Sequence, residues 1–387
     1  MYTQVLIIGA SISGLATAAC LRRGKVEFVL IEKEGSIAAP WRHHYDRLHL
    51  HTNKRLSGLP FRKWGSSAPR YPSRLEVIDY LEDYQRAFEI RPQFHTEARS
   101  VRKSENGWVT ETETGVIESD YVVMATGAYG KPRAVEFSGL ESYPGRVVHS
   151  FDYKTGADYA GQRVLVVGFG NSACEIAMDL DEHGAEVSMA VRSPVNVIPR
   201  DILGIPVLEL SLLLRYLPPR LADRISAPLV RGVIGDVSRL GLERMPYGPI
   251  EQIVKDGMAP VLDIGIVRLI RDGRVRVFGG LDRIEGAVVR FGDGRSNVFD
   301  AIVAGIGYER NCADIVEVDQ GRFDDLHIGV GRQRYFGADG LYFCGYWVSP
   351  TGQIREIARD ARKIAADIGK REKITRGGAN GYRGRSR

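Results

Sequence analysis

Two uninterrupted apolar runs, each followed by a glycine-rich turn and then by a helical pattern, are the clearest features of the chain. The first run is Val5–Ile8, and residues 9–14 after it read Gly-Ala-Ser-Ile-Ser-Gly. The second run is Val164–Val167, and residues 168–173 after it read Gly-Phe-Gly-Asn-Ser-Ala. Apolar runs without polar alternation are typical of buried parallel strands. The pattern therefore predicts two separate strand–turn–helix units.

Hydrophobic spacing predicts the remaining elements. Apolar residues at helical intervals indicate a helix from about Ser73 and a last helix that contains Ile354–Ile368. Further apolar runs predict strands at 28–32, 121–125, 187–191, 299–303 and 340–345. We expect an α/β fold with two dinucleotide-binding, Rossmann-like domains, the second inserted in the first.

The expected boundaries divide the chain into four parts. Residues 1–155 and 299–369 form the first domain, so the strand at 299–303 is expected in its sheet. Residues 156–298 form the inserted domain. The Gly- and Arg-rich residues 370–387 lack apolar periodicity, and we expect them to be disordered.

The segment 198–242 in the inserted domain is rich in Leu, Pro and Arg, and it predicts short amphipathic helices. Three interpretations stay open for it: a lid over a substrate channel, contact with a membrane surface, or plain packing.

The two turns carry a ligand prediction. A glycine-rich turn between a strand and a helix presents backbone N–H groups and a helix dipole to a pyrophosphate. Two such turns in one chain indicate two dinucleotides, and the usual pair is a flavin and a nicotinamide. Glu32 lies 18 residues after Gly14 at the end of a strand, the place of an acid that accepts hydrogen bonds from a ribose.

The corresponding strand of the second unit ends in Arg192 instead of an acid. A guanidinium matches the charge and geometry of a ribose phosphate, whereas a carboxylate repels it. The second site is therefore predicted to prefer NADP(H) over NAD(H).

Composition excludes several other classes. The chain is 44% hydrophobic and 26% charged, with a net charge of +5, as expected for a globular enzyme. Its four cysteines, Cys20, Cys174, Cys312 and Cys344, form no C-x-x-C pair, which argues against a zinc site or a dithiol reductase. We expect no bound metal, no nucleic-acid partner, no transmembrane segment, a cytoplasmic location, and a monomer or homodimer.

A polar, aromatic loop between residues 41 and 74 contains Trp41 and four histidines and suggests a site. Its run Tyr45-Asp46-Arg47-Leu48-His49-Leu50-His51, followed by Lys54, resembles a stretch of the YUCCA-type flavin monooxygenases. Residues 143–153 resemble the F-x-G-x-x-x-H-x-x-x-Y signature of class B flavin-containing monooxygenases, with Tyr143 in place of Phe. Two further departures are Ser11 for the middle glycine of the first turn and Gly305-Ile306-Gly307-Tyr308 for the family's A-T-G-Y.

The resemblance covers about residues 2–369 and implies an FAD- and NADPH-dependent monooxygenase. Such enzymes insert one atom of dioxygen into a small substrate through a flavin peroxide, and the YUCCA type decarboxylates indole-3-pyruvate to indole-3-acetate. The resemblance implies catalytic roles for His51, with His49 as the alternative, and for Lys54. It implies cofactor contacts for Gly9, Ser11, Ser13, Gly14, Glu32, Trp41, Val101, Thr126, Gly127, His149, Gly168, Gly170, Asn171, Ser172, Arg192 and Gly345.

Three other functions stay open on the sequence. The wider family oxidises nitrogen or sulfur in small amines and sulfides. The chain also fits an NADPH oxidase or reductase that passes no oxygen to an organic substrate, or a redox-sensing binding protein. Substrate-dependent NADPH consumption distinguishes them.

Overall fold

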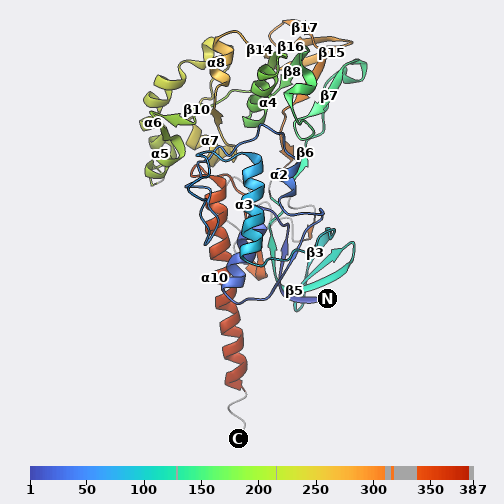
Figure 1. Cartoon of the computed structure of the whole chain (residues 1–387), viewed down its shortest axis with the longest axis vertical. Helices are drawn as coiled ribbons and strands as arrows, with labels where there is room; N and C mark the ends of the chain where they lie inside the picture. Colours follow the sequence, from blue (N-terminus) through green and yellow to red (C-terminus); the bar gives the residue numbers. More distant parts are fainter. Residues whose placement is uncertain (128–129, 215, 310–314, 318–337, 383–387) are drawn as a thin grey trace.

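A computed structural model describes residues 1–127, 130–214, 216–309, 315–317 and 338–382. The chain forms two lobes, each built on a largely parallel sheet, along the long axis of the molecule (Figure 1). The expected α/β fold is confirmed. None of the described helices is both long enough and apolar enough to cross a membrane.

The first sheet has the strand order β2-β1-β5-β4-β3-β20, with β21 beside β5. Its central strand β1 pairs in parallel with β2 and β5, while β3, β4 and β5 form an antiparallel meander. The strands are β1 Tyr2–Ile8, β2 Phe28–Ile31, β3 Ala98–Ser104, β4 Gly107–Thr112, β5 Gly115–Met124, β20 Val316–Glu317 and β21 Leu341–Phe343.

The second sheet is parallel throughout and has the order β14-β9-β8-β18-β7. Its strands are β7 Arg146–His149, β8 Arg163–Val167, β9 Glu186–Val191, β14 Val275–Gly279 and β18 Ala301–Ala304.

The pairing of β18 corrects one expectation. The strand expected at 299–303 in the first domain lies in the second sheet, between β8 and β7. The second sheet therefore draws its strands from Arg146 to Ala304, wider than the expected 156–298. A strand that is buried on both faces has the same apolar sequence in either sheet, so only the long-range pairing distinguishes the two.

Smaller sheets and the helices complete the two lobes. The short strands are β6 Lys131–Pro132, β10 Val197–Pro199, β11 Asp201–Ile202, β12 Ile205–Pro206, β13 Val261–Asp263, β15 Leu281–Glu285, β16 Val288–Phe291, β17 Ser296–Val298 and β19 Tyr308–Glu309. The α-helices are α1 Ile12–Arg23, α2 Ala39–His43, α3 Arg74–Ala87, α4 Asn171–Glu182, α5 Val207–Leu214, α6 Pro219–Ile234, α7 Pro249–Asp256, α8 Ile266–Arg271 and α10 Gln353–Tyr382. Short 3-10 turns lie at Leu140–Ser142, Gly156–Tyr159, Val237–Leu240 and Ala338–Gly340.

The helix predicted from about Ser73 is confirmed with its cap. The Ser73 hydroxyl accepts from the Glu76 N–H, and the Glu76 carboxylate accepts from the Ser73 N–H. This reciprocal pair satisfies backbone donors that the first helical turn leaves without partners. The cap fixes where the polar loop 41–73 ends.

The last helix packs its predicted apolar face on α1 in the core of the first lobe, through Ile357, Ala361 and Ile364. The tail beyond it corrects a second expectation, because α10 continues to Tyr382 and projects past the lobe (Figure 1). Arg371 Nε donates to Asp367 Oδ2 at 2.9 Å, an i, i+4 pair that supports this extension. Residues 383–387 lie outside the described part of the chain.

Candidate cofactor sites and active site

A cavity of about 680 Å³ opens at the carboxyl ends of the first-sheet strands, beside the first glycine-rich turn. Its volume falls in the range of small-molecule sites. Five of the residues predicted to bind a cofactor line it: Gly9, Ser11, Glu32, Thr126 and Gly127. Residues 96–98 and the pair Arg42 and His43 complete the wall, and sequence reasoning had not named them.

Two glycines shape the turn for close approach of a ligand. Gly9 has φ +104°, and a Cβ there would lie 2.9 Å from the Ala125 carbonyl oxygen. At Gly14 a Cβ would lie only 1.8 Å from the Gly9 carbonyl oxygen. Helix α1 starts after Ser11 without a side-chain cap, so its first N–H groups lack a side-chain acceptor. This is the arrangement that a pyrophosphate completes.

Glu32 is buried at the end of β2, where it faces this turn. Its carboxylate accepts from the Ala10 N–H at 2.7 Å and from the Glu34 N–H at 3.1 Å. Each carboxylate oxygen can accept a second hydrogen bond. The residue therefore orders the turn and keeps acceptor capacity for a ribose hydroxyl.

Two other predicted contacts, Ser13 and Gly345, lie around the same turn, and Thr126 forms a further link there. Ser13 is buried, and a Cβ on Gly345 would lie 2.3 Å from its hydroxyl oxygen, so β21 passes this close to α1 only with glycine there. Thr126 Oγ1 is 2.5 Å from the Tyr346 hydroxyl, which joins the end of β5 to the loop after β21.

Two residues of the first lobe that are predicted to contact a cofactor do not line this cavity. Val101 is a fully buried core residue of β3, and Ala98 in the same strand lines the cavity instead. Trp41 packs against the core of the first lobe, while its neighbours Pro40 and Arg42 line the cavity. The motif identified the segments that line the cavity. Packing determined which side chains of these segments face it.

The second turn repeats the geometry of the first. Gly168 has φ +116°, and a Cβ there would lie 2.4 Å from the Gly305 carbonyl oxygen. Gly170 precedes α4, which also starts without a side-chain cap. A Cβ on Gly170 would meet nothing within 4 Å, so this side of the turn is open.

The next two side chains of that turn bond to protein. Asn171 Nδ2 donates to the Pro260 carbonyl at 3.1 Å, and its Oδ1 accepts from the Leu262 N–H at 2.8 Å. Ser172 hydrogen-bonds Tyr45 of the first lobe. Because these side chains already bond to protein, a cofactor would contact Asn171 and Ser172 through their backbone N–H groups.

Arg192 directly follows β9, as the sequence predicted for the edge of the second site. Its backbone passes close to Gly280, where a Cβ would lie 2.8 Å from the Arg192 Cβ. The side chain is exposed and forms no ion pair with the described residues. Its guanidinium is free to meet a phosphate.

The two lobes meet at His51 and Glu175. The Nε2 atom of His51 hydrogen-bonds Oε1 of Glu175, which projects from α4 of the second lobe. The glutamate side chain is 2% exposed and the histidine 20% exposed. The other carboxylate oxygen of Glu175 is buried without a partner among the described residues. Sequence reasoning had not named Glu175, although an acid inside the apolar stretch 173–180 was a signal.

A buried polar network surrounds this contact. The Tyr153 hydroxyl and the Gly156 N–H both donate to Asp179 Oδ2, at 2.6 and 2.7 Å. Burial raises the pKa of Tyr45 well above its usual value, and the charge of Glu175 adds to the effect. The phenols of Tyr45 and Tyr153 therefore stay neutral, and the Tyr153 hydroxyl and the Gly156 N–H satisfy the buried Asp179 carboxylate.

His149, the central residue of the 143–153 signature, is also buried at this joint. Its Nδ1 accepts from the Phe151 N–H at 3.0 Å, so Nε2 carries the proton and donates to the Gly307 carbonyl at 3.1 Å. Burial lowers the pKa of His149, which favours this neutral form. The side chain thus links β7 to the segment after β18.

The other candidate catalytic residues have structural partners. Lys54 Nζ donates to the carbonyls of Gly65, Ser66 and Ala68 and thereby fixes a loop. His49 is exposed, with Nδ1 bound to the Arg47 carbonyl at 2.6 Å. The structure thus places His51, of the two histidines, at the joint.

His44 in the same loop predicts how stability depends on pH. Burial lowers the pKa of His44 to about 4, and the nearby positive charges of His43, Lys154 and Arg74 add to the shift. The unfolded chain, with a histidine pKa of about 6.5, binds this proton at a higher pH than the folded chain does. Stability is therefore lost as the pH falls from about 6.5 towards 4.

We expect the free energy of unfolding to fall by about 2 kcal/mol through His44 between about pH 7 and pH 5. Urea unfolding of the wild type and of His44→Gln at both pH values measures it. The variant should show the weaker pH dependence, and parallel dependences would contradict the assignment.

Fold and site together define a class: a two-lobed α/β protein with two glycine-rich turns of the kind that oxidoreductases use for dinucleotides. A family model described as pyridine nucleotide-disulphide oxidoreductase matches residues 6–201. The chain is 39% identical to indole-3-pyruvate monooxygenase YUCCA6 of Arabidopsis thaliana, over 95% of this chain and 90% of that protein. It therefore belongs to the YUCCA family of flavin-dependent monooxygenases.

Solved structures share the fold. The flavin-containing monooxygenase from Stenotrophomonas maltophilia superposes with a TM-score of 0.68 at 22% identity, over 95% of this chain and 98% of that one. A cyclohexanone monooxygenase bound to epsilon-caprolactone gives a TM-score of 0.75 at 18% identity, over 97% and 89%.

Proposed function

We propose that the protein uses FAD and NADPH to convert indole-3-pyruvate, dioxygen and a proton to indole-3-acetate, carbon dioxide and water, with NADPH oxidised to NADP⁺. The observation that carries the proposal is the 39% identity to an indole-3-pyruvate monooxygenase over almost the whole chain. The two uncapped glycine turns support the use of two dinucleotides.

The residues present fit both cofactors. The turn with Gly9 and Gly14 would hold the FAD pyrophosphate, and Glu32 its ribose. The turn with Gly168 and Gly170 would hold the NADPH pyrophosphate, and Arg192 its ribose phosphate. When bound, the flavin accepts a hydride from NADPH and activates dioxygen.

The chain's own residues hold the two lobes in position, exclude water from the contact between them and supply one hydrogen-bonded pair, His51 and Glu175. The joint is closed by the buried network around Tyr153 and Asp179, which keeps water from the contact between the lobes. The buried carboxylate of Glu175 fixes the imidazole of His51 through its Nε2 atom. We propose that the imidazole held in this way donates a hydrogen bond where oxygen chemistry takes place.

A substrate panel tests the proposed function. The purified protein is given 2-keto acids, small amines and sulfides, and NADPH consumption is measured together with product. Indole-3-pyruvate should accelerate NADPH consumption most and give close to one product per NADPH. Greater acceleration by amines or sulfides would indicate N- or S-oxygenation. Consumption that no compound accelerates would indicate an NADPH oxidase.

Arg192→Ala is expected to raise the KM for NADPH and to leave the use of NADH nearly unchanged. The loss is on the order of 1.5–3 kcal/mol, the scale of a charge-assisted hydrogen bond, or roughly ten- to a hundredfold in KM. Steady-state kinetics with both cofactors measure it. Arg268→Ala, at an exposed ion-paired arginine of α8 in the same lobe, is the matched control. Equal losses with NADPH and NADH would show that Arg192 is structural.

A further inference from the structure

Exposed apolar side chains concentrate in the segment between residues 203 and 233. Of the fifteen large hydrophobic residues that are exposed in the described part of the chain, eight lie there. Leu213 is 76% exposed and Tyr216 79%. Single exposed apolar residues are ordinary on a protein surface, but a contiguous group marks an interaction site.

Helix α6 aligns four of them. Leu221, Ile225, Leu229 and Val233 recur every four residues and are each between 44% and 54% exposed. At about 100° per residue, this spacing places the four on one side of the helix. The opposite side carries the buried Asp223 and Ile234. The helix therefore packs on the lobe with one face and presents a second apolar face outward.

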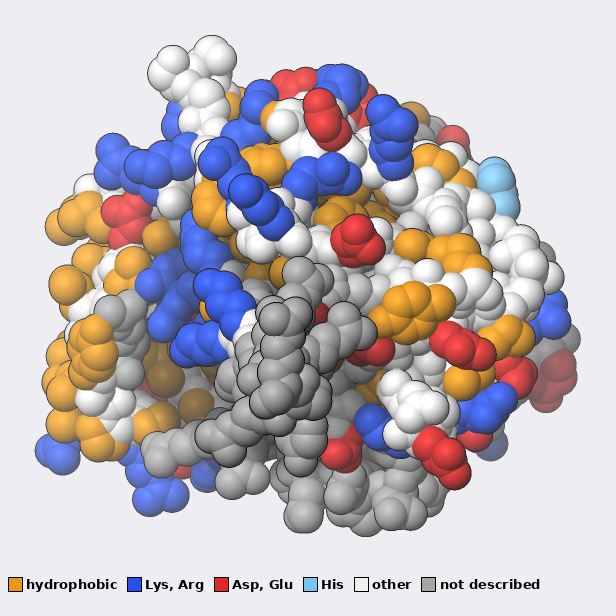
Figure 2. Space-filling view, turned by 90° about the horizontal axis from the view of Figure 1, so that it is seen from below, with side chains coloured by type: hydrophobic (Ala, Val, Ile, Leu, Met, Phe, Trp, Pro, Cys, Tyr) orange, Lys and Arg blue, Asp and Glu red, His pale blue; other side chains and the backbone are white. Residues whose placement is uncertain are grey.

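Arginines border this exposed stripe. Arg220, Arg224 and Arg231 fall together on the flank of α6, between the apolar stripe and the buried face. The left edge of Figure 2, which holds α5 and α6 in Figure 1, shows hydrophobic side chains interleaved with Lys and Arg. An apolar face with a cationic border is typical of helices that lie at a membrane surface.

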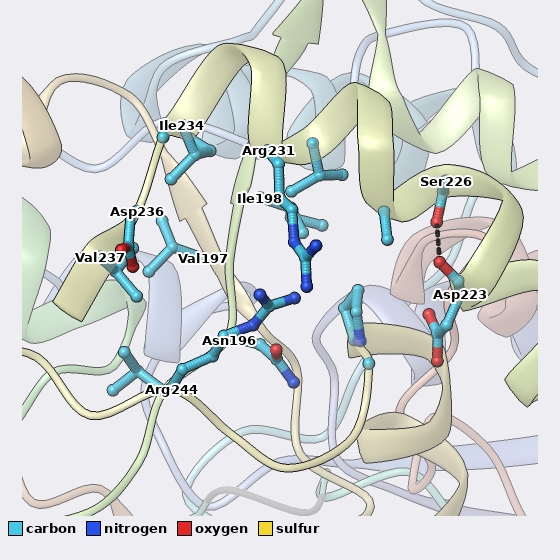
Figure 3. Close-up of a pocket in the computed structure, with 16 residues that line it drawn as sticks. Asn196, Val197, Ile198, Asp223, Ser226, Arg231, Ile234, Asp236, Val237 and Arg244 are labelled. Carbon is cyan, nitrogen blue, oxygen red and sulfur yellow. Dashed lines mark hydrogen bonds between the residues drawn. The ribbon is translucent and has the colours of Figure 1, made fainter.

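Two arginine side chains face each other beside α6 (Figure 3). Arg231 of α6 and Arg244 point towards each other across a small cavity of about 70 Å³ (Figure 3). Neither guanidinium has a hydrogen-bond partner or an ion pair among the described residues. Two facing guanidiniums repel each other, and an anion between them removes the repulsion. Asp223 and Asp236 also line the cavity, but they already accept hydrogen bonds from the backbone N–H groups of Glu251 and Ser238. The two guanidiniums are therefore the groups left to hold a phosphate.

We propose that this surface, the outward stripe of α6 with Arg231 and Arg244, docks on the face of a membrane that contains anionic lipid. The apolar side chains enter the interfacial layer, and the arginines meet lipid phosphates. A second copy of the chain is the less favourable occupant, because a two-fold contact would set the arginine borders against each other. The proposal is independent of the substrate.

Segment 203–233 also forms hydrogen bonds with the loop that contains His51 and with the segment around Pro350. Glu209 of α5 accepts from Asn53 Nδ2 at 2.6 Å, two residues after His51, and the Ser211 hydroxyl donates to the Pro350 carbonyl at 2.8 Å. Helix α5, which precedes α6 in the chain, is thus joined to the loop that contains His51 by a direct hydrogen bond.

Vesicle flotation of the full-length protein tests the proposal. Vesicles of phosphatidylcholine alone are compared with vesicles that also contain phosphatidylglycerol. The wild type should float with the anionic vesicles and should be released by high salt. Ile225→Gln/Leu229→Gln should weaken this binding by about tenfold or more. Arg231→Gln/Arg244→Gln should abolish the preference for anionic lipid.

Leu75→Gln is the matched control, because Leu75 on α3 is 60% exposed and lies in the other lobe. Its binding should equal that of the wild type. The proposal is overturned if the wild type stays unbound with anionic vesicles, or if both α6 variants float like the control. Sedimentation velocity identifies the remaining occupant: a wild-type dimer that Ile225→Gln/Leu229→Gln dissociates would make this face an interface between copies and overturn membrane docking.

Discussion

Gly14→Val should yield protein without flavin. A Cβ at Gly14 would lie 1.8 Å from the Gly9 carbonyl oxygen. No side-chain rotation can relieve this clash, because the backbone fixes the position of both the Cβ and the oxygen. The turn must open, and its N–H groups then lose the geometry that binds a pyrophosphate. We expect FAD content to fall from near one per chain to near zero, as measured by flavin absorbance of the desalted protein.

Two comparisons separate loss of the site from loss of the fold. Gly369→Ala, at a helical position where a Cβ meets nothing within 4 Å, should keep its flavin. Gly14→Val should still bind an immobilised NADP analogue, because the second turn lies in the other lobe. If Gly14→Val retained full flavin, the first turn would not be the FAD site.

The second large effect concerns the pair His51 and Glu175. His51→Ala removes the donor at the joint and leaves the buried carboxylate of Glu175 without a partner. Hydride transfer needs only the two cofactors in contact, whereas product formation also needs the hydrogen-bond donor and a dry site. We therefore expect product per NADPH to fall by about tenfold or more, with flavin reduction affected less.

The measurement is rapid-mixing absorbance of the flavin, with yields of hydrogen peroxide and product, and with indole-3-pyruvate as the first substrate. Glu175→Gln keeps the shape of the pair but removes its charge, so it should lower product per NADPH by less than His51→Ala does. His49→Gln is the control, because that ring is exposed and bonds only a carbonyl of its own loop. His149→Ala should impair both steps, since it breaks the link between β7 and Gly307. Wild-type coupling in His51→Ala would contradict the assignment, and a loss of coupling in His49→Gln would transfer the role to His49.

The local sequence predicted those elements that depend only on interactions between residues close together in the chain. The first dinucleotide turn needs only a strand, a turn with Gly9 and Gly14, and an uncapped helix, which follow one another within about fifteen residues. The sequence therefore predicted this turn, and it predicted the second turn in the same way. The Ser73 cap was readable for the same reason. The family resemblance added the cofactors and the reaction, which no spacing by itself defines.

Only the tertiary structure decided where distant segments meet. The strand at 301–304 joined the second sheet, because pairing partners more than a hundred residues away, and not its own apolar sequence, select the sheet. Val101 turned into the core, since side-chain direction in a strand depends on register and not on the motif that contains it. The pair of His51 and Glu175 spans 124 residues and two lobes, and only their packing brings a buried carboxylate to that imidazole. The sequence thus determined which groups this protein has for binding two dinucleotides, and the packing of its two lobes decided which of them work together.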